Sequence, residues 1–292
     1  MEHLTHPSHD GFPLSVDLFP VERPRAVVQL IHGAKEHKER YHPFIAHLNE
    51  HGYAAVIADN RGHGASVNER WPLSFIDDFR LLPEDQYAVT CLVRQRFPGV
   101  PLAVLGHSLG SMIARIYLQK HDDEPQALIL SGTANFIPAG IVGIAAANTV
   151  CALRGEHAYS RLLERMANFL DDSWVVGDAE ALAAYRADPL CTYPYPAASM
   201  REIFRIDREL HAYDRFAVKA PELPILSISG ALDPVTGGER GLADTERTLR
   251  RLGYDDLTFT VYPGMYHEVL NETGRAEVWQ DVLTFLDRHF AP

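Results

Sequence analysis

A glycine–x–serine–x–glycine stretch, Gly106 to Gly110, has Ser108 at its centre and offers the clearest chemistry in the sequence. The apolar run at residues 101–105 predicts a buried strand, and the apolar spacing of residues 111–118 predicts a helix. A sharp turn between such elements holds the serine in a strained conformation with its hydroxyl exposed. Side chains two residues away on either side would collide, which explains both glycines. The pattern therefore predicts that Ser108 is a nucleophile.

A serine hydroxyl is a weak nucleophile near neutral pH, so it needs a base and a group that orients the base. Asp233 follows a predicted strand at 224–229, and His267 follows another at 257–262. Parallel strands deliver their ends to one edge of a sheet, so we expect both side chains beside Ser108. His267 would accept the proton of Ser108. Asp233 would hold the imidazole in one tautomer and stabilise the imidazolium.

Other histidines also end predicted strands. His32 and His63 lie in glycine turns before Ser108, whereas the base follows the serine and the acid in the chain order typical of hydrolases. We therefore expect His32 to brace its loop. A structural alternative stays open for Asp233, which would serve as a turn aspartate before Pro234.

The negative charge that develops on a carbonyl oxygen during acyl transfer needs donors. One would be the backbone N–H of Leu109, directly after the nucleophile. The other would come from the loop after an earlier strand, and we expect the N–H of Ala34 there, with Gly33 allowing a tight turn.

Composition narrows the class of protein. The chain has 292 residues and a net charge of −12. A surface with this charge repels nucleic acid and does not attract anionic lipid. Its first residues lack the basic and apolar regions of a signal peptide. Three widely spaced cysteines, Cys91, Cys151 and Cys191, favour a reducing compartment, so we expect a cytoplasmic protein. No cysteine–histidine cluster has zinc spacing, and we expect neither metal nor cofactor.

Predicted strands alternate with predicted helices, which indicates an α/β fold with a mostly parallel sheet covered by helices on both faces. The alternation stops after Thr133 and resumes near Pro224, and the intervening residues show helical patterns only. We therefore expect a core in two parts, residues 1–133 and 219–292, interrupted by a helical cap insertion at 134–218.

The cap opens with an apolar stretch at residues 136–153, which is short and rich in glycine and alanine for a membrane span. We expect a buried helix that lines a pocket, with Ile141 and Ile144 contacting substrate. Contact of this segment with a membrane surface, at most transient, is the alternative.

The sequence also carries motifs of a known family. They are His32-Gly-Ala-Lys-Glu-His37 with Arg40-Tyr41, Asp59-x-Arg-Gly-His-Gly-x-Ser66, Gly106-His-Ser-Leu-Gly110, Ala187-Asp-Pro-Leu190, Gly230-x-x-Asp-Pro-Val235 and Tyr266-His267. In this order, over nearly the whole chain, they resemble the serine α/β-hydrolase superfamily, and within it the monoacylglycerol lipase and lysophospholipase group. The resemblance implies the α/β-hydrolase fold, a helical cap over an acyl-binding pocket, and hydrolysis of single-chain lipid esters. It also implies a structural turn at residues 59–66. Lys35 departs from the family, which often has glycine there.

Three alternatives to lipid-ester hydrolysis are compatible with the sequence. A serine aminopeptidase, or a hydrolase of small esters, would use the same core. An aminopeptidase needs cap carboxylates for the substrate ammonium, and the candidates are Glu156, Glu164, Glu202 and Glu209. A non-catalytic binding module is the third class, but such a module typically lacks one of the three catalytic residues. We expect a small-molecule acyl ester as the substrate, and no nucleic acid as a partner.

Overall fold

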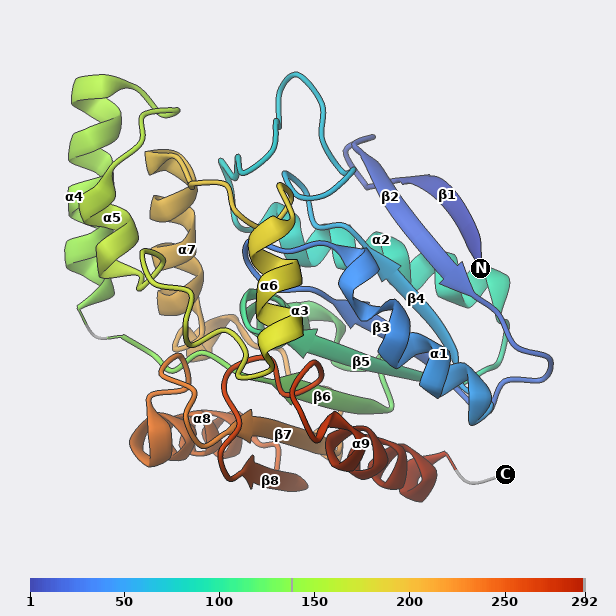
Figure 1. The fold of residues 1–292 in the computed structure, drawn as a ribbon. Helices are drawn as coiled ribbons and strands as arrows, with labels where there is room; N and C mark the ends of the chain where they lie inside the picture. Colours follow the sequence, from blue (N-terminus) through green and yellow to red (C-terminus); the bar gives the residue numbers. More distant parts are fainter. Residues whose placement is uncertain (138, 291–292) are drawn as a thin grey trace.

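The computed structural model describes residues 1–137 and 139–290. Within them, eight strands form one sheet in the order β1-β2-β4-β3-β5-β6-β7-β8 (Figure 1). The strands are β1 (Glu2–Pro7), β2 (Pro13–Phe19), β3 (Val27–Ile31), β4 (Ala54–Ala58), β5 (Leu102–His107), β6 (Ala127–Ser131), β7 (Ile225–Gly230) and β8 (Leu257–Tyr262). The pairs β1–β2 and β2–β4 are antiparallel, and all other pairs are parallel. The predicted mostly parallel sheet is confirmed.

Helices cover both faces of this sheet. Those that pack on it are α1 (His42–Glu50), preceded by the short η1 (Lys38–Tyr41), α2 (Leu81–Arg96), α3 (Leu109–His121), α8 (Gly238–Leu252) and α9 (Arg275–His289). Side chains of α1 and α9 share one core with Val28 and Leu30, whereas α2, α3 and α8 share the other with Val27 and Ile31. Because β3 is buried on both faces, its sequence is nearly continuously apolar rather than alternating.

The outer edge of the sheet differs from the sequence expectation. The alternating run 12–19 predicts an edge strand, but β2 lies between β1 and β4, with Glu2 opposite Leu18 and Val16 opposite Ala58. That prediction is wrong. The edge strand is β1, and the sequence gives little sign of it because a strand with one partner and exposed side chains needs few apolar residues.

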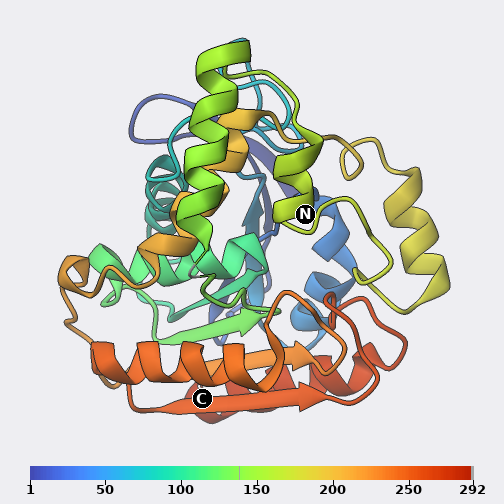
Figure 2. The same ribbon diagram turned by 90° about the vertical axis from the view of Figure 1, so that its left-hand side faces the viewer.

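In the part of the segment between β6 and β7 that the structure describes, there are four helices, as its helical pattern predicts. They are α4 (Gly140–Arg154), α5 (Arg161–Met166), α6 (Ala179–Ala187) and α7 (Ala197–Glu209), followed by the short η2 (Tyr213–Arg215). Figure 2 shows α4 running alongside α7. Among the described residues, no helix combines the length and the apolar character that crossing a bilayer requires.

The glycine and alanine content of α4 has a packing reason. Gly140, Gly143 and Ala147 are buried, and a Cβ added to Gly143 would lie 2.7 Å from the ring of Phe204 on α7. Small residues therefore let the two helices approach closely. The larger residues of α4 point elsewhere: the side chains of Ile141 and Val142 are 57% and 59% exposed.

The turn at residues 59–66 is a buried polar structure, as the resemblance implies. The Asp59 carboxylate accepts hydrogen bonds from the backbone N–H groups of Lys38 (2.8 Å) and Ala65 (2.9 Å). Arg61 lies between Asp85 (2.7 Å) and Asp10 (2.7 Å), and its hydrogen bonds to Asp10 lower the pKa of that carboxyl to about 2. The Arg61 side chain is almost fully buried. This ion cluster fixes the loop after β4 against the start of α2.

We predict that Arg61→Met lowers the free energy of unfolding by about 3–5 kcal/mol, since it leaves the buried Asp85 carboxylate without its cation. Arg80→Met is the matched control. Arg80 pairs with Asp78 at 2.7 Å but is 72% exposed, so its loss is expected to cost at most about 1 kcal/mol. Urea denaturation of both variants measures the difference, and equal destabilisation would contradict the role assigned to Arg61.

Candidate active site

Ser108 lies between β5 and α3 in a strained backbone conformation, with φ 52° and ψ −118°. The turn is held by very close backbone contacts. A Cβ on Gly106 would lie 2.4 Å from the carbonyl oxygen of Gly110, and one on Gly110 would lie 2.1 Å from that of Ile31. The collisions expected from the sequence are therefore confirmed, and only glycine fits at either position.

Asp233 and His267 meet at the same end of the sheet. The Asp233 Oδ2 atom lies 2.8 Å from His267 Nδ1, and both side chains are buried. The other carboxylate oxygen, Oδ1, accepts the backbone N–H of Val235 at 2.8 Å. This leaves the Nε2 atom of His267 as the ring nitrogen that does not face the carboxylate. His267 lines a cavity together with Ser108.

The two side chains shift each other's titration. Burial lowers the pKa of His267, but the charge of Asp233 and its hydrogen bond, together with the charges of Glu268 and Glu36, outweigh burial and raise the pKa above its usual value. Burial alone would raise the pKa of Asp233, whereas the charge and hydrogen bond of His267 lower it. The pair therefore favours an imidazolium beside a carboxylate.

The loop after β3 brings Ala34 next to Ser108. A Cβ on Gly33 would lie 2.7 Å from Glu36 Oε1 and 2.9 Å from Ser108 Cβ, so the tight turn requires glycine. The Gly33 N–H donates to Glu36. Within the described part of the chain, the N–H groups of Ala34 and Leu109 donate to no protein acceptor. Both residues border a cavity that also contains Ser108.

His32 and His63 have structural partners. His32 Nδ1 donates to the carbonyl oxygen of Gly33 (2.8 Å), and Nε2 accepts the backbone N–H of Asn60 (2.8 Å). His63 Nε2 lies 2.6 Å from the Tyr195 hydroxyl. Burial lowers the pKa of His32 to about 3 and that of His63 to about 4, so both rings are neutral near pH 7. The expectation that His32 braces its loop is confirmed.

A buried ion cluster beside the site is not evident from the sequence. Arg40 donates to Glu36 (3.1 Å) and, through two nitrogens, to Glu268 (2.5 and 2.7 Å). It ties the loop that carries Ala34 to the loop that carries His267. Burial raises the pKa of Glu36, whereas the Arg40 charge outweighs burial and lowers the pKa of Glu268. Glu268 follows His267 directly, but its partner is 228 residues away.

Two cavities meet at Ser108, and they differ in chemistry. The more polar one is bordered by Lys35, Glu36, Asp171, Asp172, Thr192 and Glu268, besides His267. The other is largely apolar and is bordered by Met112, Ile137, Met166, Ile203, Phe204 and Val235. Asp207 also borders the apolar cavity, and burial raises the pKa of its carboxyl to about 7. Ala34, Ser108, Phe169 and Trp174 are common to both.

Ile141 and Ile144 are not brought to Ser108. The side chain of Ile141 is mostly exposed, and Ile144 borders a different cavity among charged side chains such as Arg205 and Glu209. The reason is the close approach of α4 to α7, which turns the small residues of α4 inward. The apolar lining near Ser108 comes instead from α3, α5 and α7 and from the loop that contains Val235.

The sheet, the strained turn at Ser108 and the helical segment between β6 and β7 define an α/β-hydrolase. The chain belongs to the family described as serine aminopeptidase, S33, whose model matches residues 22–274. It is a monoacylglycerol lipase-like member, as its motifs predict. It is 33% identical to the monoacylglycerol lipase of Mycolicibacterium smegmatis, over 92% of this chain and 91% of that protein. It is 27% identical to the mouse monoglyceride lipase, over 87% and 78% respectively.

Solved structures share this fold. A thermostable carboxyl esterase from Bacillus coagulans, in complex with glycerol, has a TM-score of 0.87 and 24% identity over 99% of each chain. A soluble variant of the Saccharomyces cerevisiae monoglyceride lipase, in complex with a substrate analogue, has a TM-score of 0.78 and 22% identity, over 99% of this chain and 94% of that chain.

Proposed function

We propose that this carboxylic ester hydrolase cleaves esters of single-chain lipids, of the monoacylglycerol or lysophospholipid type, through an acyl-enzyme on Ser108. The observation that carries the proposal is the pair of unlike cavities that meet at this serine. An ester of this kind has an apolar chain on one side of its carbonyl group and a polar alcohol on the other. The chain would lie among Met112, Met166 and Phe204, and the alcohol would lie beside Lys35 and His267.

The reaction would proceed in two halves. His267 Nε2 accepts the proton of Ser108 Oγ as this oxygen attacks the ester carbonyl carbon, and the N–H groups of Ala34 and Leu109 receive the oxyanion. When the intermediate collapses, the alcohol leaves with the proton from His267. Water then attacks the acyl-enzyme with the same base, and the acid is released. Asp233 keeps the Nδ1 proton in place and stabilises the imidazolium.

The aminopeptidase alternative is disfavoured by the cap carboxylates. Glu164 pairs with Lys35 at 3.0 Å, Glu209 with Arg215 at 2.8 Å, and Glu202 with both Arg201 (2.8 Å) and Arg205 (2.7 Å). Glu156 lies 3.6 Å from Arg201. Each carboxylate already has a cationic partner, so none is free to hold a substrate ammonium.

Exposed apolar residues on α4 and just before it support a further part of the proposal, namely transient contact of the cap with a lipid surface. Exposed large apolar side chains here are Ile137, Ile141, Val142 and Leu153. Their burial at an interface would bring the cap, which we place at residues 134–218, to the lipids that supply the substrate.

The three cysteines are free thiols, in keeping with a cytoplasmic location.

We predict that Ser108→Ala lowers kcat for ester hydrolysis by roughly 10⁴-fold or more while the melting temperature stays close to that of the unmodified protein. A fluorophosphonate probe should label the unmodified protein and not the variant. Hydrolysis by Ser108→Ala at a near-normal rate would overturn the mechanism. A protein that neither reacts with the probe nor hydrolyses any ester would be a binding module.

The pH dependence tests His267. A base must be neutral, so kcat/KM for a soluble ester should rise with pH through an apparent pKa above about 6.5, the ordinary histidine value, because Asp233 and the nearby glutamates raise the pKa. Asp233→Asn should lower kcat/KM and shift the midpoint to lower pH. The same shift contributes stability that is present below about pH 6.5 and is lost as pH rises through the native pKa. A flat profile, or an unmoved midpoint in Asp233→Asn, would argue against this base.

Acyl-chain dependence tests the apolar cavity. Each buried CH₂ contributes about 0.8 kcal/mol, so each added methylene should raise kcat/KM by up to roughly fourfold until the cavity is full. Octanoyl p-nitrophenyl ester should therefore be cleaved clearly faster than the acetyl ester. Met166→Glu, with its charge in the cavity, should reduce this preference. Equal kcat/KM values for the two esters would leave only a small-ester hydrolase.

Ile141→Glu is the matched control, because the residue lies on the exposed part of α4. Its octanoyl-to-acetyl ratio in solution should equal that of the unmodified protein. Its co-sedimentation with phosphatidylcholine vesicles should fall, and unchanged co-sedimentation would remove the proposed membrane contact.

A further inference from the structure

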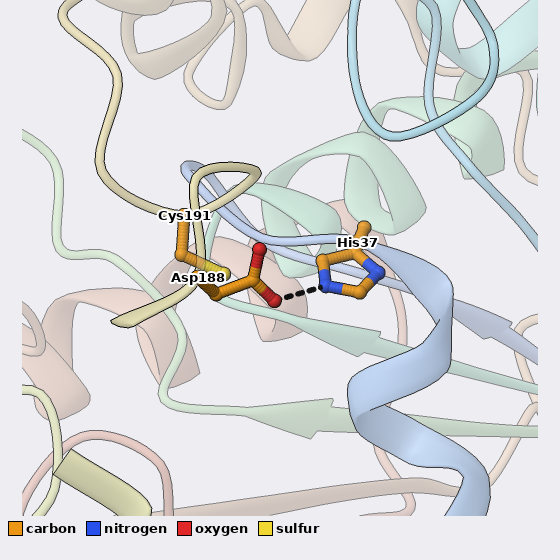
Figure 3. A group of neighbouring side chains, drawn as sticks. All are labelled: His37, Asp188 and Cys191. Carbon is orange, nitrogen blue, oxygen red and sulfur yellow. Dashed lines mark hydrogen bonds and ion pairs between the residues drawn. The ribbon is translucent and has the colours of Figure 1, made fainter. Parts of the chain in front are cut away.

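A histidine, an aspartate and a cysteine meet where the loop after β3 touches the turn after α6. His37 comes from the first, and Asp188 and Cys191 come from the second (Figure 3). His37 Nε2 lies 2.8 Å from Asp188 Oδ2, and one ligand atom from each of the three residues lies within 4.8 Å of the others. We propose that these three side chains form a Zn²⁺ site that links the cap to the core.

The turn that carries Asp188 and Cys191 is built to present both side chains together. The Cys191 N–H donates to the carbonyl oxygen of Asp188 at 3.0 Å, which closes a tight turn. The N–H of Leu190 donates to Asp188 Oδ1 at 2.8 Å. This bond orients the carboxylate and leaves Oδ2 directed at His37. An outer hydrogen bond of this kind typically fixes the position of a metal-binding carboxylate.

The surroundings of the site suit a divalent cation. Cys191 is fully buried and His37 is 6% exposed, yet Cys191 borders the polar cavity near Ser108, which gives an ion a route inward. The nearby Arg40 is already held by Glu36 and Glu268. With Asp188, these groups place three carboxyl groups and one guanidinium near the site.

The donor set selects the metal. Imidazole and thiolate favour Zn²⁺ over Mg²⁺ or Ca²⁺, and three protein ligands with one water complete a tetrahedral shell. Binding replaces the His37–Asp188 hydrogen bond with two bonds to the ion. The proton on His37 Nε2 moves to Nδ1, which leaves Nε2 free to bind, and the Cys191 thiol releases its proton to solvent. Tetrahedral bonds of about 2.0–2.3 Å hold ligand atoms roughly 3.3–3.6 Å apart. The nitrogen and oxygen atoms must therefore separate by about half an ångström, which side-chain rotation allows.

A second group, His9, Asp10 and Asp85, has a similar spacing. There, however, Arg61 binds both carboxylates, so a cation would have to displace a buried guanidinium. In the proposed site, the described residues give a cation one hydrogen bond to displace, that between His37 and Asp188, besides the protons of its ligands. This contrast is why we assign the metal to His37, Asp188 and Cys191.

The test measures metal binding rather than hydrolysis, so its failure and the failure of the proposed function are distinguishable. The full chain, treated with a chelator and dialysed, is titrated with Zn²⁺ in a calorimeter. We expect one ion per chain. Cys191→Ala should weaken binding by about 100-fold or more, since the loss of an outer-shell partner alone costs roughly 10–100-fold. Cys91→Ala, which removes an exposed thiol, is the matched control and should bind normally.

Cobalt supplies a second measurement that needs no variant. Co²⁺ at this site should give intense visible bands of a tetrahedral ion and a thiolate-to-cobalt charge-transfer band, and Zn²⁺ should abolish both. The absence of these bands at saturating Co²⁺, or equal Zn²⁺ affinity for Cys191→Ala and the unmodified protein, would overturn the proposal. In that case His37 and Asp188 would be only a hydrogen-bonded link between cap and core.

Discussion

The contact between the turn at Ser108 and the end of β3 constrains the whole architecture around the site. Gly110 lies so close to the carbonyl oxygen of Ile31 that no side chain fits between them. This contact fixes the first turn of α3 against the sheet and holds Ser108 at a positive φ. Such strain persists only where the surroundings over-determine the backbone. Here they do so because β5 is buried and pairs along its length with two parallel strands, β3 and β6.

Around that fixed point, polar residues are arranged in buried pairs and clusters rather than singly. Asp233 and His267 share one hydrogen bond, and Arg40 joins two carboxylates from distant parts of the chain. In each case an opposite charge or a hydrogen bond offsets the loss of hydration. The loops after β3 and β8 are thus held to each other as well as to the sheet. This keeps the side chains near Ser108 in fixed positions relative to one another.

The sequence predicts the core of this arrangement better than its cap. Ser108, Asp233 and His267 each follow a strand whose pattern of apolar residues is recognisable in the sequence, so their meeting at one edge follows from parallel topology. The two glycines around Ser108 are equally predictable, because the turn between a strand and a helix leaves no room for side chains at these positions. The pairing of Arg40 with Glu268 is not local, since it depends on how two distant loops cross.

Two residues that the sequence places in the pocket, Ile141 and Ile144, lie elsewhere because of a contact that is also not local. Ile141 and Ile144 look like pocket residues because they are apolar in an apolar segment. The buried side of α4 is instead the one that carries glycine and alanine, because their small size allows close contact with α7. Hydrophobicity alone did not identify that face. The sequence does not predict β1, because an exposed strand with one neighbour needs little apolar surface.

The loop that carries Ala34 is also held by the helical segment between β6 and β7. Lys35 pairs with Glu164 at 3.0 Å, the N–H of Lys35 donates to the Tyr195 hydroxyl at 3.2 Å, and His37 bonds to Asp188. This segment could therefore not be exchanged for another without loss of contacts that hold the core loop. A replacement cap that offered a different pocket but no carboxylate for Lys35 would leave a largely buried ammonium without its counter-ion. New substrate ranges are therefore more accessible through changes within α5 and α7 than through exchange of the cap as a whole.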